Sequence, residues 1–298
     1  WWIKIMDSSK RKSISYTQVS MYNECPWKWK LNYIDGLREF KGNIHTLFGS
    51  AMHEVLQTYL DVMYARSIKA ADELPLDKLL KARMEEQFNN MHEFGTKDYL
   101  VSKEDMNEFY NDGLLILEFF KKRRAEYFSN RGYKLLGCEV AIDYDIPKNL
   151  RFVGYLDIVI HDTVRDVIQI YDIKTSTMGW NKWQKANKNK TSQLLLYKKF
   201  YSEQYNHPID KIEVEYFIVK RKLYENMDFP QKRIQKFSPA SGKPSINKTL
   251  TMLKEFVDEA FTDDGQYNTS HQFRKLPSAK NCKWCEFKNK PELCDRRK

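Results

Sequence analysis

Apolar residues recur at helical spacing from Phe48 to Met63, a pattern that predicts one long amphipathic helix. His53 lies on this helix, one turn after Gly49, where the missing side chain lets another backbone approach closely. The stretch from about Ala65 to Asn130 is charged and almost free of Pro and Gly, so we predict two or three further helices there. We expect these helices to form an insertion or subdomain.

The N-terminal region also has a helical pattern. Ser15, followed three residues later by Gln18, resembles a capping box. Pro26 interrupts the pattern and places Cys25 at a helix break. The apolar positions of this segment are Val19, Tyr22 and Trp29. We therefore predict a helical segment in two parts.

After Leu135 the pattern changes to short runs rich in Val, Ile and Tyr. The runs 135–146, 151–160 and 166–174 are separated by turn-like residues and predict three consecutive strands. A helix over 191–205, strands over 212–220 and 233–237, and an amphipathic helix over 246–261 complete the series. There is no internal repeat. This order predicts an α/β or α+β fold.

The composition suits a globular, enzyme-sized chain with a polyanionic partner. Hydrophobic residues make up 42% of the 298, and no apolar run approaches the roughly 20 residues that cross a bilayer. We see no signal peptide and expect a soluble, cytoplasmic protein. The net charge of +10 favours nucleic acid, although a solvated basic surface would also produce it. Basic runs occur at Lys121–Arg124, Lys182–Lys190, Lys220–Lys222 and Arg296–Lys298, and Trp180 and Trp183 in the second run could stack bases.

Two predicted strands each deliver an acid at or near their ends. In the strand 166–174, alternation of side chains puts Asp172 and Lys174 on one face while Ile173 points into the core. Asp157 ends an otherwise apolar run in the preceding strand. A divalent ion needs hard oxygen ligands, and a phosphate under attack needs a nearby cation, so these residues suit phosphodiester chemistry. Taken singly, the same residues also suit an exposed ion pair and a turn-capping aspartate.

Together the motifs resemble the RecB-like nucleases of the PD-(D/E)xK superfamily. They are, in order, Ser13–Tyr16, Tyr22–Pro26, Gly49-x-x-x-His53, Gly154-x-x-Asp157, Asp172-x-Lys174 and Gln193–Tyr197. The resemblance implies a restriction-endonuclease-like core with a mixed central sheet flanked by helices. It further implies an N-terminal helical segment over 1–46, a nuclease core over 47–262 with the helical insertion at about 65–132, and a cysteine-rich segment over 263–298.

The resemblance also implies a role for each motif residue. His53, Asp157, Asp172 and the backbone carbonyl of Ile173 would hold Mn²⁺ or Mg²⁺, and Lys174 would stabilise or orient the attacking water. Gln193 and Tyr197, which share one helix face, would position the site or the DNA. Glu139 on the first predicted strand is a possible auxiliary carboxylate. The other histidines are interpreted as packing residues, namely His45, His92, His161, His207 and His271.

Three of the five cysteines have metal-ligand spacing. Cys282-x-x-Cys285 with Cys294 leaves a tetrahedral site one thiolate short, and Cys25 is the best fourth ligand. Spacing alone does not separate an iron-sulfur cluster from Zn²⁺. The resemblance implies a [4Fe-4S] cluster that staples the two chain ends, as in the CRISPR-associated RecB-like exonuclease family. Cys138 is interpreted as an ordinary buried cysteine.

The leading hypothesis is an iron-sulfur, Mn²⁺- or Mg²⁺-dependent DNA exonuclease. By resemblance it would prefer single-stranded DNA, with endonuclease activity as a further option, in CRISPR-type processing, phage replication or recombination. A helicase, recombination or integrase partner and an oligomer would fit, since the chain has no phosphate loop for a motor of its own. The alternative is a non-catalytic DNA-binding module with a structural zinc or iron-sulfur site.

Overall fold

The computed structural model describes residues 11–38, 42–94 and 101–295. The basic run Arg296–Lys298 and the side chain of His92 lie outside this part of the chain. The helices are α1 (Tyr16–Glu24), α2 (Pro26–Tyr33), α3 (Ile44–Ala65), α4 (Ile68–Asp72), α5 (Leu76–Phe94), α6 (Lys103–Arg123), α7 (Lys182–Ala186), α8 (Lys188–Thr191), α9 (Gln193–Gln204), α10 (Lys243–Ala260) and α11 (Ala279–Cys282). The strands are β1 (Ser13–Ile14), β2 (Tyr133–Ile146), β3 (Leu150–Asp162), β4 (Val167–Ser176), β5 (Ile212–Lys220) and β6 (Ile234–Phe237).

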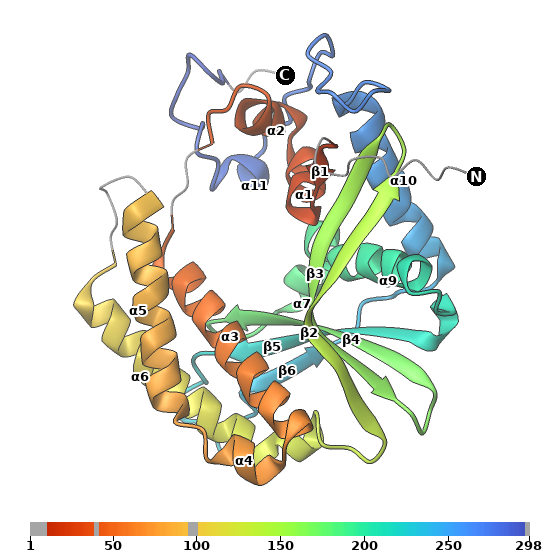
Figure 1. Cartoon of the computed structure of the whole chain (residues 1–298). Coiled ribbons are helices and arrows are strands. Elements are labelled where there is room, and N and C mark those ends of the chain that lie inside the picture. Colours follow the sequence, from red (N-terminus) through yellow and green to blue (C-terminus); the bar gives the residue numbers. More distant parts are fainter. Residues whose placement is uncertain (1–10, 39–41, 95–100, 296–298) are drawn as a thin grey trace.

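The strands form one mixed sheet in the order β1-β3-β4-β5-β6, and β2 pairs with β3 along its whole length (Figure 1). On its other edge β3 has two different partners. Its start pairs in parallel with β1, and its end pairs antiparallel with β4 from Ile158↔Tyr171 to Asp162↔Val167. Beyond Ile158 and Tyr171 the two strands separate, while β4 continues in parallel register with β5 up to Ser176. The point where β3 and β4 separate is here called the fork. Beyond it, the edge of β4 that faces β3 has no strand partner.

Helices cover both faces of the sheet, and each face has its own buried apolar cluster. Helices α3, α5 and α6 pack on one side, and α9 and α10 on the other (Figure 1). Apolar residues point alternately to the two faces, so Ile170 joins one cluster while Tyr171 and Ile173 join the other. The mixed α/β fold predicted from the sequence is confirmed, whereas the three segment boundaries stay predictions.

The N-terminal and C-terminal segments lie side by side at one end of the molecule, where α1 and α2 neighbour α10 and α11 (Figure 1). An aromatic cluster joins them: Trp29 of α2 is completely buried, with its ring against Tyr22, Phe256, Phe261 and Phe273. Aromatic rings bury large areas and interlock, so this cluster holds together parts that are far apart in the sequence.

Most predicted elements are confirmed, with small shifts that have local causes. The helix break at Pro26 falls between α1 and α2 as expected. The capping box is wrong: Ser15 is the N-cap of α1, but its side chain makes no capping hydrogen bond, and Gln18 Nε2 donates instead to the Ser13 carbonyl at 3.3 Å. Strand β4 begins at Val167 because Asp166 has a φ of 52°, a turn conformation.

Candidate active site

The candidate site lies at the fork between β3 and β4. Asp157 directly precedes Ile158, the residue at which the pairing of β3 with β4 ends. Its Oδ2 accepts a hydrogen bond of 2.6 Å from the Ile173 backbone N–H. The carboxylate thus takes the place that a strand backbone would occupy if the ladder continued. Asp172, the neighbour of Ile173, is only 3% exposed. The separation of the strands therefore brings two acids from different strands to one place.

Helix α3 brings His53 to the same fork. The helix starts with a capping box between Asn43 and Thr46, and His53 Nδ1 lies 3.5 Å from Asp157 Oδ2. A Cβ on Gly49 would lie 3.1 Å from Thr175 Oγ1, so a larger residue there would push α3 away from β4. Burial and the charge of Lys174 lower the pKa of His53 to about 4. The imidazole is therefore neutral near pH 7, the form that can bind a metal.

Lys174 is the cation of the site. Its Nζ lies 2.7 Å from Asp172 Oδ2, as expected for two residues on one face of a strand. Burial alone would lower the pKa of the Lys174 ammonium, but the carboxylates of Asp172 and Asp157 outweigh it and raise that pKa. The side chain therefore stays protonated.

The negative charge of the site exceeds its positive charge. Burial raises the pKa of both Asp157 and Asp172 to about 6, although Lys174 acts in the opposite direction. When both acids are ionised and His53 is neutral, one ammonium faces two carboxylates in a buried setting. Asp172 Oδ2 is buried, and apart from its ion pair with Lys174 no hydrogen-bond donor among the described residues reaches it. Such a site gains from a further cation.

A divalent ion fits these residues in chemistry and in charge. Carboxylate oxygens, a neutral imidazole and a backbone carbonyl are ligands that Mn²⁺ and Mg²⁺ accept. In the part of the chain that the structure describes, however, no three His, Cys, Asp or Glu side chains are close enough to form a ready metal site. The donors instead pair with one another, His53 with Asp157 and Asp172 with Lys174.

Gln193 and Tyr197 lie on the first turns of α9 and face the fork from the other side of the sheet. Gln193 Nε2 donates to Tyr197 Oη at 3.2 Å. Burial, with the charge of Asp172, raises the pKa of Tyr197 to about 12, although the Gln193 hydrogen bond opposes the shift. A Cβ on Gly154 of β3 would lie 2.7 Å from the Tyr197 ring, so only glycine leaves room for this ring. The five predicted catalytic residues thus gather around one fork.

We expect Gly154→Ala to lower the nuclease activity that the motif resemblance implies by about 10²-fold, because the added methyl group would push the Tyr197 ring out of place at the fork. The free energy of unfolding should fall by about 1–3 kcal/mol, as for other overpacked sites. Initial cleavage rates and urea unfolding curves of the two proteins measure both effects. Full activity in the variant would show that the position of Tyr197 is unimportant.

Gln57, a residue beside the site, was not predicted from the sequence. Gln57 is buried, and its Nε2 donates to Glu139 Oε1 at 2.6 Å and to the Asp157 carbonyl at 3.0 Å. It follows His53 by four residues on α3, so its spacing was a usable signal. Glu139 has a φ of 50° and a charge that acts on both His53 and Asp157. Gln57 therefore links this acid to the strand that carries Asp157.

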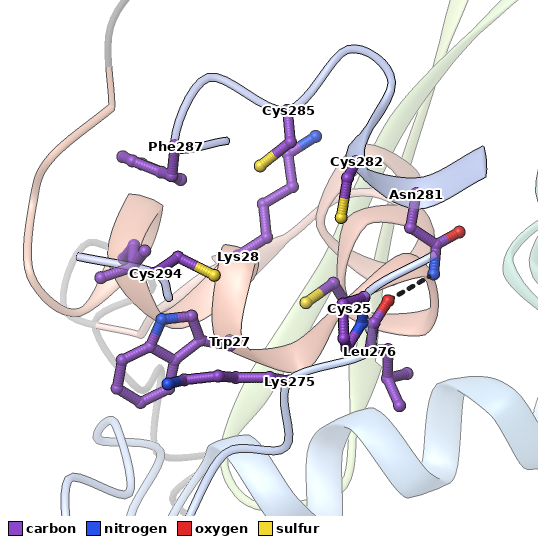
Figure 2. A pocket seen from close by; sticks show the side chains of 12 residues that line it. Cys25, Trp27, Lys28, Lys275, Leu276, Asn281, Cys282, Cys285, Phe287 and Cys294 are labelled. Carbon is purple, nitrogen blue, oxygen red and sulfur yellow. Dashed lines mark hydrogen bonds between the residues drawn. The ribbon is translucent and has the colours of Figure 1, made fainter. Parts of the chain in front are cut away.

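Four of the five cysteines lie together between the N-terminal and C-terminal segments, away from the fork. Cys25, Cys282, Cys285 and Cys294 line one cavity of about 30 Å³ between the chain ends, and their sulfur atoms face its interior (Figure 2). All four are half-buried and form no disulfide. Their donor set fits a four-thiolate metal group, but the described residues do not form a closed metal site here. Cys138 is half-buried rather than fully buried, and burial raises the pKa of its thiol.

Hydrogen bonds tie the two cysteine-bearing segments together. Trp27 Nε1 donates to the Leu293 carbonyl at 3.0 Å, and Asn281 Nδ2 donates to the Glu24 carbonyl at 2.8 Å. Lys28 lines the same cavity and pairs with Glu286 at 3.6 Å. The cavity is thus held by contacts that do not depend on a metal.

Comparison with known proteins agrees with this fold. The sequence matches the PD-(D/E)XK nuclease superfamily over residues 13–290, and the chain belongs to that superfamily. No curated protein matches the sequence. None of the helices in the described ranges is long and apolar enough to cross a membrane.

Among solved structures, the chain is similar to the crystal structure of a "Putative exonuclease" from Eubacterium rectale. The match has a TM-score of 0.51 at 10% identity and covers 97% of this chain and 92% of the other. At this identity the likeness shows the fold alone.

A divalent cation is expected to stabilise the protein more at neutral than at acid pH. Asp157 and Asp172, whose pKa values are raised, must lose their protons to bind it. Without metal, the stability that the protonated acids contribute is full below about pH 4 and is lost as the pH rises through about 6. His53, with its lowered pKa, acts oppositely over this range, but two acids outweigh one imidazole.

Thermal unfolding with MnCl₂ or EDTA measures this difference. At about 100 times Kd the cation contributes about 2.7 kcal/mol, which for a chain of this size raises Tm by about 5 °C. We expect this rise near pH 7.5 and less than half of it near pH 5. An equal rise at both pH values would mean that the cation binds elsewhere.

Proposed function

We propose that this chain is a Mn²⁺- or Mg²⁺-dependent DNA exonuclease that prefers single strands. The observation that carries the proposal is the fork itself, where Asp157 and Asp172 bring more negative charge than Lys174 can balance. Membership of the nuclease superfamily supports the same chemistry. The name of the Eubacterium rectale protein, "Putative exonuclease", supports action at DNA ends.

His53, Asp157, Asp172 and the Ile173 carbonyl are the proposed ligands. When bound, the ion supplies neutralisation of charge on the scissile phosphate and lowers the pKa of the attacking water. Lys174 is held as an ammonium by Asp172, so it donates hydrogen bonds to the water or the phosphate and does not act as a base. Tyr197, oriented by Gln193 and packed on Gly154, positions the strand beside these groups.

Single-strand preference is supported by an exposed aromatic among cations. Trp183 is 73% exposed on the lysine-rich segment that leads into α9, and stacking on such a ring needs unpaired bases. Trp180 does not share this role, which corrects the sequence-based suggestion. It is buried against Tyr216 and Phe237 because the segment turns its apolar side toward the sheet.

The test is cleavage of end-labelled single-stranded and double-stranded DNA with Mn²⁺, Mg²⁺ or EDTA. We expect metal-dependent cleavage that starts at ends and is faster on single strands. Lys174→Ala should abolish it, whereas Lys78→Ala, an exposed lysine on α5, should leave it unchanged. DNA binding without cleavage under every condition would reject the nuclease and support the non-catalytic module. Equal rates on both substrates would reject the strand preference alone.

For the cysteine cavity we propose a [4Fe-4S] cluster that staples the chain ends. The support is the set of four cysteine sulfurs around one cavity between the N-terminal and C-terminal segments. Protein purified without oxygen should be brown and contain iron, and Cys285→Ser should lose it. A colourless, zinc-loaded protein would overturn the cluster.

A further inference from the structure

A polar pocket, here called the lysine pocket, lies between the α7–α8 segment and the start of α10. Its volume is about 290 Å³, and its walls include Lys185, Lys188, Lys248, Thr191, Ser192 and Thr249. No described Asp or Glu lines it, and none of its three lysines forms an ion pair with a described carboxylate. The pocket therefore offers ammonium groups that no acid among the described residues neutralises.

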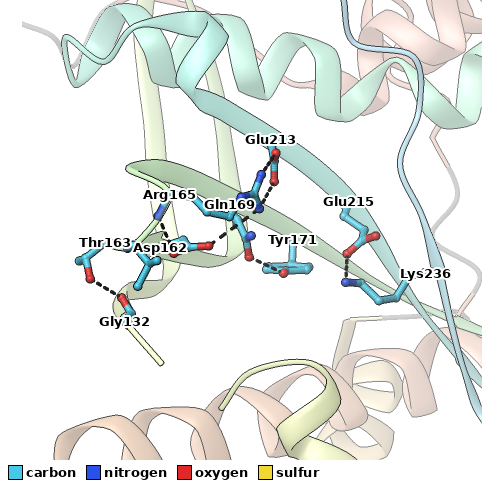
Figure 3. A network of polar contacts seen from close by, with 10 residues as sticks. Gly132, Asp162, Thr163, Arg165, Gln169, Tyr171, Glu213, Glu215 and Lys236 are labelled. Atoms are coloured by element: carbon cyan, nitrogen blue, oxygen red, sulfur yellow. Dashed lines mark hydrogen bonds and ion pairs between the residues drawn. The ribbon is translucent and has the colours of Figure 1, made fainter. Parts of the chain in front are cut away.

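Another polar pocket of this protein shows the contrast. It has a volume of about 510 Å³ across the starts of β4 and β5, and its three cations, Arg165, Lys198 and Lys236, are matched by three acids, Asp210, Glu213 and Glu215. Figure 3 shows two of the pairs. Arg165 binds Glu213 through both ends of its guanidinium, and Lys236 lies 2.6 Å from Glu215. The positive and negative charges in this pocket balance, so it has no excess positive charge to attract an anion. Of these two pockets, only the lysine pocket has a net positive charge, which favours the binding of an anion.

The backbone around the lysine pocket is fixed by hydroxyl groups. Tyr16 Oη donates to the Asn189 carbonyl at 3.1 Å, and Tyr216 Oη donates to the Lys190 carbonyl at 2.8 Å. Thr249 Oγ1 donates to Ser192 Oγ at 3.2 Å and so joins α10 to the start of α9. The walls are therefore in place before a ligand arrives, which lowers the entropic cost of binding.

Two helix N-termini add to the positive potential. Ser192 precedes the 12-residue α9, and Gly242 precedes the 18-residue α10. Neither residue caps its helix with a side chain, and Ser192 and Ser245 line the pocket. The N-terminal end of a helix carries a partial positive charge that favours phosphate. This contribution adds to that of the lysines.

The lysine pocket adjoins the candidate active site. Ser192 is followed directly by Gln193, which binds Tyr197 at the fork. Desolvation and the charge of Lys174 lower the pKa of Lys190, which places α8 within electrostatic reach of the catalytic lysine. A strand bound at the fork can therefore pass along the start of α9 into this pocket.

From these observations we propose that the lysine pocket binds a backbone phosphate of the DNA strand, one other than the scissile phosphate. The inference rests on the proposed nuclease function, because it takes the occupant to be the strand that the fork cleaves. The lysines neutralise the phosphodiester and donate hydrogen bonds to its oxygens, and the helix ends add positive potential. The pocket thereby fixes how the strand enters the site without selecting a base sequence.

The test measures binding without catalysis. Fluorescence anisotropy in EDTA gives the affinity for a labelled oligothymidylate of about 20 nucleotides. We expect the triple variant Lys185→Gln, Lys188→Gln, Lys248→Gln to bind about tenfold more weakly, with a slope of log affinity against log salt that is smaller by about 0.7, the value for one lost phosphate contact on a single strand. The control Lys69→Gln, Lys78→Gln, Lys81→Gln loses the same charge on α4 and α5 and should bind within about twofold of the parent. Equal losses in both variants would overturn the pocket.

A second measurement locates the contact. Single phosphates of the oligonucleotide are replaced in turn by uncharged methylphosphonates. One internal position should weaken binding to the parent protein but not to the lysine-pocket variant, and identical profiles for both would overturn the proposal. If the parent binds the oligonucleotide but never cleaves it with Mn²⁺, the nuclease function fails and the binding comparison still stands. If it cleaves while both triple variants bind alike, only the pocket fails.

Discussion

Replacing Asp172 by asparagine is expected to lower the rate of DNA cleavage by about 10³-fold or more, because it removes a buried anionic ligand from the proposed ion site. Asparagine keeps the shape of the side chain, so the change tests its charge. Burial raises the pKa of Asp172 to about 6, which means that ionising it costs stability near neutral pH. The same variant should therefore melt, in EDTA, at the temperature of the parent or above it.

Opposite effects on activity and stability distinguish a functional acid from a structural one. Asp228→Asn, in the exposed loop between β5 and β6, is the matched control and should change neither quantity. Both variants are compared by initial rates on one end-labelled oligonucleotide and by thermal unfolding without metal. If Asp172→Asn cleaves at the parental rate, Asp172 is no ligand. If it melts well below the parent, its carboxylate holds the fold together.

Trp29→Ala is expected to lower the free energy of unfolding by about 3–5 kcal/mol, the range for a large buried aromatic. The side chain is fully buried where α1, α10 and the C-terminal segment meet. Alanine would leave a cavity that these separately anchored elements cannot fill. The backbone N–H of Trp29 donates to the Cys25 carbonyl at 3.1 Å, so α2 starts at this cysteine and looser packing of α2 should weaken binding of the proposed cluster.

Trp183→Ala makes the same chemical change on the surface and is the control. Its side chain is 73% exposed, so the free energy of unfolding should stay within about 0.5 kcal/mol of the parent in urea titrations. Its affinity for oligothymidylate should instead fall by about fivefold or more, because one stacked base contributes about 1–3 kcal/mol. Equal destabilisation by both substitutions would contradict the assignment of Trp29 to the joint between the chain ends.

The sequence by itself determined the elements and their order. Helical spacing around His53, and three runs of Val, Ile and Tyr, correspond to α3 and to β2, β3 and β4 within a few residues. These signals are local, because the period of apolar residues reflects the conformation of the same segment. The order of the acidic, lysine and glutamine motifs also identified the nuclease superfamily, which the match over 13–290 bears out.

Only the tertiary structure decided which motif residues meet at one site and which groups they contact there. Periodicity does not show where β4 leaves β3, yet that fork sets Asp157 against the Ile173 N–H. It also leaves Asp172 Oδ2 with Lys174 as its one polar partner among the described residues. It also separated Trp180 from Trp183, which look alike in sequence, and it gathered Lys248 with Lys185 and Lys188 from another part of the chain. The physical reason is that burial and charge balance depend on neighbours that are distant in sequence, and only the packing of the sheet and its helices selects those neighbours.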